Sequence, residues 1–207
     1  MICRAGYSLW AAALLGGALT AAGVETLSYS VVRSDDRFEV RRYDAYIVAE
    51  VVVEGDMEEA GNRAFGTLFE YISGKNRPGD KIAMTAPVEQ RSKPAKIPMT
   101  APVEQRAQGD RWAVAFVMPA SYTLDTLPDP ENPDVMLRKI PARRVAAVRY
   151  SGFWSRKNYR KHRDALQKWI KEQNLTPAGP PVWARYNPPF IPWFLRRNEV
   201  LIPVKTP

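Results

Sequence analysis

An internal repeat that covers most of the chain is the feature that most constrains its fold. Residues 135–152 align with residues 38–55 without a gap, 97 positions apart. The identical pairs include Arg41 and Arg138, Ala45 and Ala142, Ala49 and Ala146, Val51 and Val148, and Gly55 and Gly152. A repeat at a fixed offset indicates that one supersecondary unit occurs twice. We therefore expect two similar halves that share one core.

Strand patterns recur in both halves. Alternating apolar residues predict strands over 38–43 and 45–53 in the first half, and the repeat places two more strands over 135–152. Three later segments have the same apolar, β-branched and aromatic character: 112–118, 182–186 and 199–204. The chain is thus expected to be rich in short strands.

A helix pattern follows the first strand pair in each half. Asp56 is a good N-cap with Glu59 three residues later, and Gly74 is suited to end the helix. Between them apolar residues recur at helical spacing: Ala60, Ala64, Phe65, Leu68, Phe69 and Ile72. In the second half Ser155 is the predicted N-cap, and the apolar stripe consists of Tyr159, His162, Leu166, Trp169 and Ile170. Each helix is amphipathic and should pack one face on a sheet.

These elements predict an α+β fold of two β-β-α-β-β units. The units should pack about a pseudo-twofold axis, with the strands inside and the helices outside. Residues 24–207 then form a single domain, and a cleft where the two halves meet is a natural ligand site.

A second, shorter duplication lies in the middle of the chain. Residues 81–91 return as residues 96–106, fifteen positions later, with Ala83 replaced by Pro98. Apolar residues alternate in both copies, and residues 92–95 have turn character, so the two copies are expected to form a hairpin. Met84 and Met99 either fill the core or face a ligand, since prolines in both copies favour a bent, bulged sheet.

Composition excludes several kinds of site. The formal charge is +8, but no nucleic-acid-binding motif accompanies the basic residues, so an anionic small molecule or an anionic membrane surface is the expected partner. Cys3 is the only cysteine and His162 the only histidine, which excludes a disulfide and a zinc cluster within one chain. Phosphate loops, nucleophile elbows and dinucleotide fingerprints are also absent, and we do not expect an enzyme.

The N-terminus has the pattern of a secretory signal. Arg4 precedes an uncharged run, residues 9–22 are strongly apolar, and small residues follow at 20–23. Residues 1–23 are therefore expected to be a signal peptide that is cleaved after Ala22 or Gly23, which places the mature chain in the periplasm or outside the cell. An uncleaved anchor formed by residues 5–24 is the alternative, since about twenty apolar residues span a bilayer.

Several motifs in this order resemble the SOUL heme-binding protein family. They occur between about Tyr29 and Val204, nearly the whole mature chain, and comprise Met-Thr-Ala-Pro-Val at 84–88 and 99–103, Trp112, Phe116-Val-Met-Pro119, Tyr122-Thr-Leu, Leu127-Pro-Asp-Pro130, Ser151-Gly152, Ala184-Arg-Tyr-Asn-Pro-Pro189 and Phe194-Leu-Arg-Arg-Asn-Glu-Val200. The resemblance implies a distorted antiparallel β-barrel flanked by two long helices. The same structure is similar to the effector-binding domains of multidrug-sensing regulators.

The resemblance also implies non-covalent binding of heme or a related tetrapyrrole in an apolar cleft. That cleft would lie between the first helix and the loop before the last strand. By position, its residues would be Asn62, Phe65, Phe69, Glu70, Tyr186, Phe190 and Ile191. We expect a monomer that sequesters, buffers or transports its ligand.

The chain departs from the family at charged positions of this cleft. Heme-binding members resembling it tend to have basic residues, which neutralise heme propionates, at the equivalents of Asn62, Glu70 and Ile191. Three nearby basic residues could replace them: Arg63, Lys75 and Arg196. A histidine proposed as an axial ligand in another branch is Arg42 here. His162 is then the remaining candidate iron ligand, and the alternative is a half-buried histidine with a packing role.

Three other functions remain open from the sequence. A carrier or sensor module for another flat apolar molecule, including a cation, would fit the missing basic residues. An enzyme could use Glu70 with Tyr186 as an acid–base pair. A structural role at the envelope would follow if the N-terminus stayed uncleaved. The apolar loop 187–194 either folds back on the core or is exposed for a use.

Overall fold

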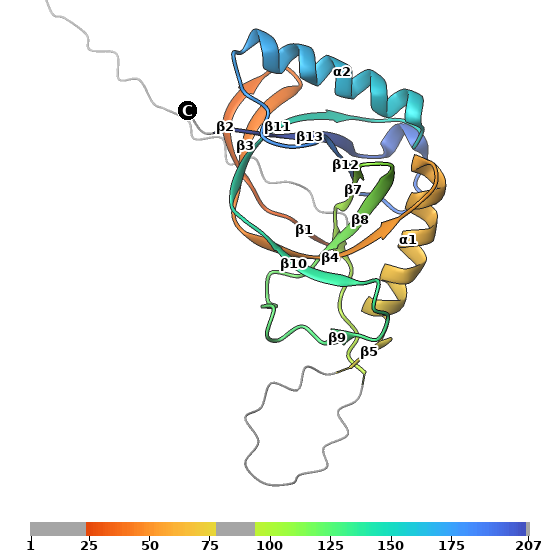
Figure 1. Ribbon diagram of the computed structural model, residues 1–207. Coiled ribbons are helices and arrows are strands. Elements are labelled where there is room, and N and C mark those ends of the chain that lie inside the picture. The colour runs from red at the N-terminus through yellow and green to blue at the C-terminus, as the bar shows by residue number, and fades with distance from the viewer. Residues whose placement is uncertain (1–23, 78–93, 206–207) are drawn as a thin grey trace, which may run out of the picture.

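The computed structural model describes residues 24–77 and 94–205. Its main element is a nine-stranded sheet in which every neighbouring pair is antiparallel, and which curls into a half-barrel (Figure 1). In sheet order the strands are β10 (Met136–Ile140), β4 (Tyr46–Val53), β8 (Arg111–Val117), β7 (Val103–Gln108), β12 (Val182–Arg185), β13 (Asn198–Val204), β11 (Arg143–Tyr150), β3 (Phe38–Tyr43) and β2 (Ser30–Asp35). Two short two-stranded sheets lie outside this large sheet. In one, β1 (Glu25–Thr26) pairs with β6 (Thr100–Ala101), and in the other, β5 (Asn76–Arg77) pairs with β9 (Asp129–Pro130).

The order of the strands confirms the pseudo-twofold repeat. β7 and β12 pair at the centre, and β8, β4 and β10 follow on one side as β13, β11 and β3 follow on the other. The first strand of each half lies at the edge of the other half, because β3 pairs with β11 and β10 pairs with β4. The sequence repeat did not reveal this exchange, which joins both halves into one core.

Two helices cover the outer face of the curled sheet (Figure 1). α1 (Met57–Ile72) packs on β4 and β8, and α2 (Arg156–Glu172) packs on β11 and β13. Both predicted caps are present, since Asp56 and Ser155 accept hydrogen bonds from backbone N–H groups of the first turns. The predicted stripe of α2 is buried throughout.

Three apolar clusters form the core. One lies under each helix, and the third fills the inside of the half-barrel, where Tyr43, Tyr46 and Val48 meet residues of β8, β11, β12 and β13. Charged residues also lie inside, and two buried carboxylates among them have arginine partners: Glu199 pairs with Arg41, and Glu50 pairs with Arg106. A buried charge is tolerated when it has such a partner.

The structure describes only the second copy of the short duplication, whose residues 103–106 belong to β7. Both edges of β7 are occupied, by β8 and by β12, so no further strand can pair with it. The expected alternation of burial is not observed in the second copy, because Ile97 is buried, Met99 is 37% exposed, and residues 100–105 are all buried. The first copy, which contains Met84, lies outside the described residues.

The apolar loop after β12 is exposed and does not fold back on the core. Phe190 is 80% exposed, and Phe194 and Leu195 in the short 3-10 helix η1 (Trp193–Leu195) are also exposed. Phe153 and Trp193 stack on each other with ring centroids 5.1 Å apart. The predicted signal or anchor, residues 1–23, lies outside the described part. Within the described part, no helix has the length and apolar character needed to cross a membrane.

Candidate functional site

A cavity opens between α1 and the segment that follows β12. We call it the α1 cleft and define it by its lining residues: Val24, Gly61, Asn62, Phe65, Met99, Thr100, Ala101, Val103, Trp154, Arg185, Tyr186, Asn187, Pro188 and Pro189. Its volume is about 270 Å³ and most of its wall is apolar. It lies at the junction of the halves, since Gly61 and Phe65 belong to the first half and Trp154 and Tyr186 to the second. Such apolar junctions are typical ligand sites.

Aromatic rings extend from the wall of the α1 cleft to the surface. Phe65 packs edge-on against Phe116 of β8, with ring centroids 5.2 Å apart, and this contact fixes the Phe65 ring. Phe69, one helical turn later, stacks on Phe65 at 6.1 Å and is 49% exposed. Phe190 directly follows the lining residue Pro189. Exposed apolar rings therefore adjoin residues of the cavity wall, Phe69 by stacking on Phe65 and Phe190 by following Pro189 in the chain.

The structure brings together some of the residues predicted from the sequence and separates others. Asn62, Phe65 and Tyr186 line the α1 cleft, whereas Phe69, Phe190 and Ile191 are not part of its wall. Glu70 lies in a different depression and forms an ion pair with Lys75 at 2.9 Å. The acid–base pair of Glu70 with Tyr186 considered from the sequence therefore does not share one cavity.

Three basic residues were expected to supply the missing positive charge, and each has another partner. Arg63 donates a hydrogen bond to the carbonyl oxygen of Glu54. Lys75 pairs with Glu70. Arg196 donates to the carbonyl oxygens of Ile191 and Pro189, both at 2.7 Å, and so fixes the loop beside the cleft. Within the described residues, these three side chains serve local structure.

Sequence reasoning missed Arg185, which lines the α1 cleft. Its guanidinium carbon lies 5.3 Å from the ring centroid of Trp154 and 5.0 Å from that of Trp183. The closest hydrogen-bond acceptor is Gln105 Oε1, at 3.5 Å from Nη2. Arg185 was part of the Ala184–Pro189 motif, but a motif cannot tell which of its side chains face a cavity.

The hydroxyl of Tyr186 is engaged in the interior. It donates to Glu199 Oε2 at 2.9 Å, and the guanidinium of Arg197 lies 3.9 Å from the ring centroid. Burial, together with the negative charge of Glu199, raises the pKa of Tyr186 well above its usual value. Tyr186 therefore contributes its ring to the cleft, while its proton stays on the hydroxyl.

His162 belongs to the buried face of α2, and it does not line the α1 cleft. Its ring stacks on Tyr150 at 3.9 Å between centroids, and its buried Nδ1 has no hydrogen-bond partner among the described residues. Burial lowers the pKa of His162 to about 4, with Arg37 and Lys161 adding to the effect. In the part of the chain that the structure describes, no three His, Cys, Asp or Glu side chains are grouped as metal ligands.

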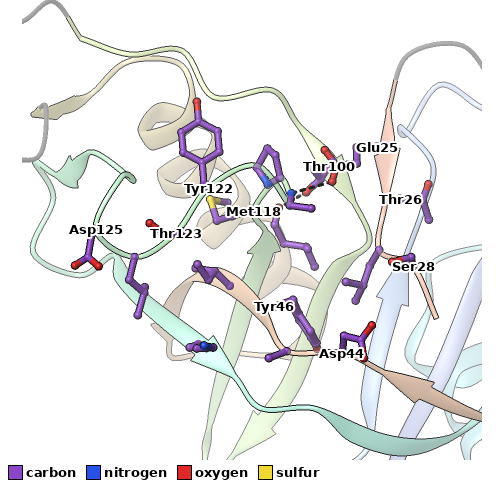
Figure 2. Close-up of a pocket in the computed structure, with 18 residues that line it drawn as sticks. Glu25, Thr26, Ser28, Asp44, Tyr46, Thr100, Met118, Tyr122, Thr123 and Asp125 are labelled. Atoms are coloured by element: carbon purple, nitrogen blue, oxygen red, sulfur yellow. Dashed lines mark hydrogen bonds between the residues drawn. The ribbon is translucent and has the colours of Figure 1, made fainter. Parts of the chain in front are cut away.

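A larger cavity, of about 560 Å³, is lined in part by residues 25–28 (Figure 2). Figure 2 shows that its labelled side chains are mostly polar, with Glu25, Asp44 and Asp125 around Tyr46 and Tyr122. Glu25 is engaged there, because it accepts a hydrogen bond from the backbone N–H of Ala120 at 2.9 Å. The α1 cleft is smaller but has the more apolar wall, which suits a flat apolar ligand better.

Known structures with the same fold confirm the expected architecture. The C-terminal domain of EcmrR superposes with a TM-score of 0.55 and 10% sequence identity, covering 86% of this chain and 99% of that chain. A hydrolase from Listeria innocua superposes with a TM-score of 0.53 and 12% identity, covering 84% and 94%. Identities this low establish a common fold and no common function.

Sequence comparison identifies the family. A search of curated proteins gives no match. The family model for the SOUL heme-binding protein matches residues 24–203, which include both halves, both helices and every strand of the half-barrel. The motifs that pointed to this family in the sequence lie within the matched region. The chain therefore belongs to the SOUL heme-binding protein family.

Proposed function

We propose that this protein binds heme or a related tetrapyrrole non-covalently in the α1 cleft. The observation that carries the proposal is an apolar cavity at the junction of the two halves, lined by Phe65, Met99, Trp154 and Tyr186, in a chain of a heme-binding family. Flat apolar macrocycles gain most of their binding free energy from contact with such walls.

The size of the cavity determines how the ligand would lie. About 270 Å³ is slightly below the range of typical ligand cavities, which span roughly 300–1,000 Å³. One edge of the macrocycle would occupy the α1 cleft, and the opposite edge would rest against the exposed rings of Phe69 and Phe190. A ligand held in this way exchanges readily, which suits buffering or transport better than permanent storage.

We place this activity outside the cytoplasm, since the N-terminal pattern is that of a secretory signal. The intact mass of the protein purified from fractionated cells tests this. A periplasmic or secreted product that begins at Gly23 or Val24 supports the proposal. A full-length product in the membrane fraction supports the anchor formed by residues 5–24 instead.

The binding proposal is tested by titrating hemin into the purified protein and following the Soret band and tryptophan fluorescence. Met99→Glu places a carboxylate in the α1 cleft at a side chain that is already 37% exposed. Met136→Glu is the matched control, because Met136 is 48% exposed on the edge strand β10 and does not line the cleft. Both variants are expected to fold.

Saturable one-to-one binding is expected in the wild type and in Met136→Glu. Binding should weaken about tenfold or more in Met99→Glu, because an unpaired carboxylate in an apolar wall must be desolvated when the ligand covers it. Absence of saturable hemin binding to the folded wild type would overturn the proposal. Equal binding by both variants would exclude the α1 cleft as the site.

A further inference from the structure

Arg185 lies between the sheet and the helix α1, and it lacks an acidic partner among the described residues. Two other arginines of the sheet are paired with carboxylates: Arg41 with Glu199 at 2.6 Å, and Arg106 with Glu50 at 2.9 Å. No carboxylate of the described residues lies within ion-pair distance of Arg185. Its guanidinium therefore has no counter-charge among the described residues, and Arg185 lines the α1 cleft.

The contacts of Arg185 do not replace a carboxylate. Its Nε is buried and has no hydrogen-bond acceptor among the described residues, and its bond to Gln105 is long. The rings of Trp154 and Trp183 hold the guanidinium by cation–π contact, which fixes its position but supplies no negative charge. Burial lowers the pKa of Arg185 to about 10, so the group is still a cation at neutral pH.

An unpaired buried cation costs free energy that an anion at the same place restores. A planar guanidinium with free N–H groups matches a carboxylate in shape and in hydrogen-bond geometry. We propose that Arg185 is the anion-binding residue of the α1 cleft, and that the ligand enters with a carboxylate directed at this guanidinium. This inference rests on the proposed function and assigns the polar contact that the apolar wall lacks.

The absence of a side chain at Gly61 gives the guanidinium its place under α1. A Cβ at position 61 would lie 3.2 Å from Nη2 of Arg185 and 3.1 Å from Oε1 of Gln105, closer than ordinary contacts. Glycine at this position therefore allows the helix to approach the guanidinium without displacing it.

The proposal also chooses between two ligand classes. A flat apolar cation would meet a second positive charge at Arg185 and would be repelled. A flat molecule with a carboxylate, such as a tetrapyrrole with propionate groups, would be attracted. The basic residue of the cleft is thus Arg185 rather than a residue at positions 62, 70 or 191, where heme-binding members of the family tend to have basic side chains.

The test compares the affinities of two ligands for the wild type and for one variant. Hemin and its dimethyl ester, which lacks both carboxylates, are titrated into wild type and into Arg185→Met, which keeps a long apolar side chain. Arg163→Met is the matched control, because Arg163 is an arginine of α2 that pairs with Asp164 and does not line the cleft. Thermal unfolding of each variant confirms that it is folded.

The wild type should bind hemin about ten- to a hundredfold more tightly than the ester, which is the range for a hydrogen-bonded charge pair. Arg185→Met should bind hemin and the ester equally, with the ester affinity of the wild type retained, and Arg163→Met should behave as the wild type. A preference for hemin that persists in Arg185→Met would overturn the inference while leaving the proposed function intact. Failure of the wild type to bind either ligand would overturn the proposed function itself.

Discussion

At the scale of single residues, the interior of this protein depends on one buried carboxylate. Glu199 accepts hydrogen bonds from Arg41, Arg197 and Tyr186, and its side chain is fully buried. Burial alone would raise the pKa of Glu199, but the charges and hydrogen bonds of the two arginines outweigh burial and lower it. The ionised carboxylate is therefore an integral part of the folded state.

Glu199→Gln should destabilise the protein by about 3–5 kcal/mol, because Arg197 would lose its carboxylate partner and Arg41 would keep only Glu39. Urea unfolding followed by tryptophan fluorescence measures the loss. Glu172→Gln is the control, since Glu172 forms only an exposed pair with Lys168 at 3.8 Å, and its loss should cost less than about 0.5 kcal/mol. A small effect of Glu199→Gln would show that the arginines find other partners.

His162 should make the protein less stable as the pH falls. The folded protein holds this imidazole neutral, with a pKa of about 4, whereas the unfolded chain binds a proton near the ordinary value of about 6.5. The unfolded state is therefore favoured progressively as the pH falls from about 6.5 toward 4. His162→Phe keeps a ring against Tyr150 and removes the titration, so its Tm should fall less between pH 7 and pH 5. Parallel pH profiles of Tm would contradict this assignment.

At the scale of elements, both helices begin in the same way. Gly55 and Gly152, at equivalent places of the repeat, have φ angles of +107° and +134°, which only glycine adopts readily. Each turns the chain from a strand into the helix that follows. The capping differs, because Asp56 accepts two backbone hydrogen bonds at 2.8 and 2.9 Å, whereas Ser155 accepts one at 3.3 Å.

Asp56→Ala should therefore lower the Tm more than Ser155→Ala. Loss of a good N-cap shifts the Tm of a domain of this size by about 2–4 °C, and the longer single bond of Ser155 should account for less than that. Differential scanning calorimetry of the two variants beside the wild type gives the comparison. The reverse order would mean that other contacts at the start of α2 matter more than its cap.

At the scale of the whole molecule, the two halves share one sheet and cannot be separated along the chain. The central pair of β7 and β12 joins them. In addition, β3 and β10 each pair with a strand of the other half. Within the described residues, β7 and its pairing with β8 and β12 use only the second copy of the short duplication.

Deletion of residues 81–95, which removes one fifteen-residue unit, should leave the fold and hemin binding intact. The retained copy supplies Met99, Thr100, Ala101 and Val103 to the wall of the α1 cleft. We expect a Tm within about 2–4 °C of the wild type, corresponding to a change of about 1 kcal/mol. Loss of cooperative unfolding or of hemin binding in the deletion variant would show that the first copy is required.

The sequence by itself determined the helices and strands and their division into two similar halves. The 97-residue repeat, the caps Asp56 and Ser155, and the apolar stripe of α2 were correct because they depend on local spacing and on residue chemistry. The family motifs likewise lay in the matched region. The short duplication did not predict that β7 pairs with β8 and β12, since the pairing with β12 depends on a segment far along the chain.

Only the tertiary structure decided the polar chemistry of the site. The family resemblance implied that Glu70 belonged to the cleft, but Glu70 pairs with Lys75 and lies in a separate depression. Arg185 looked like one more basic residue, and its lack of a carboxylate partner emerged from the distances around it. Whether a charge is compensated depends on neighbours brought together by folding, and the order of residues in a chain does not contain those distances.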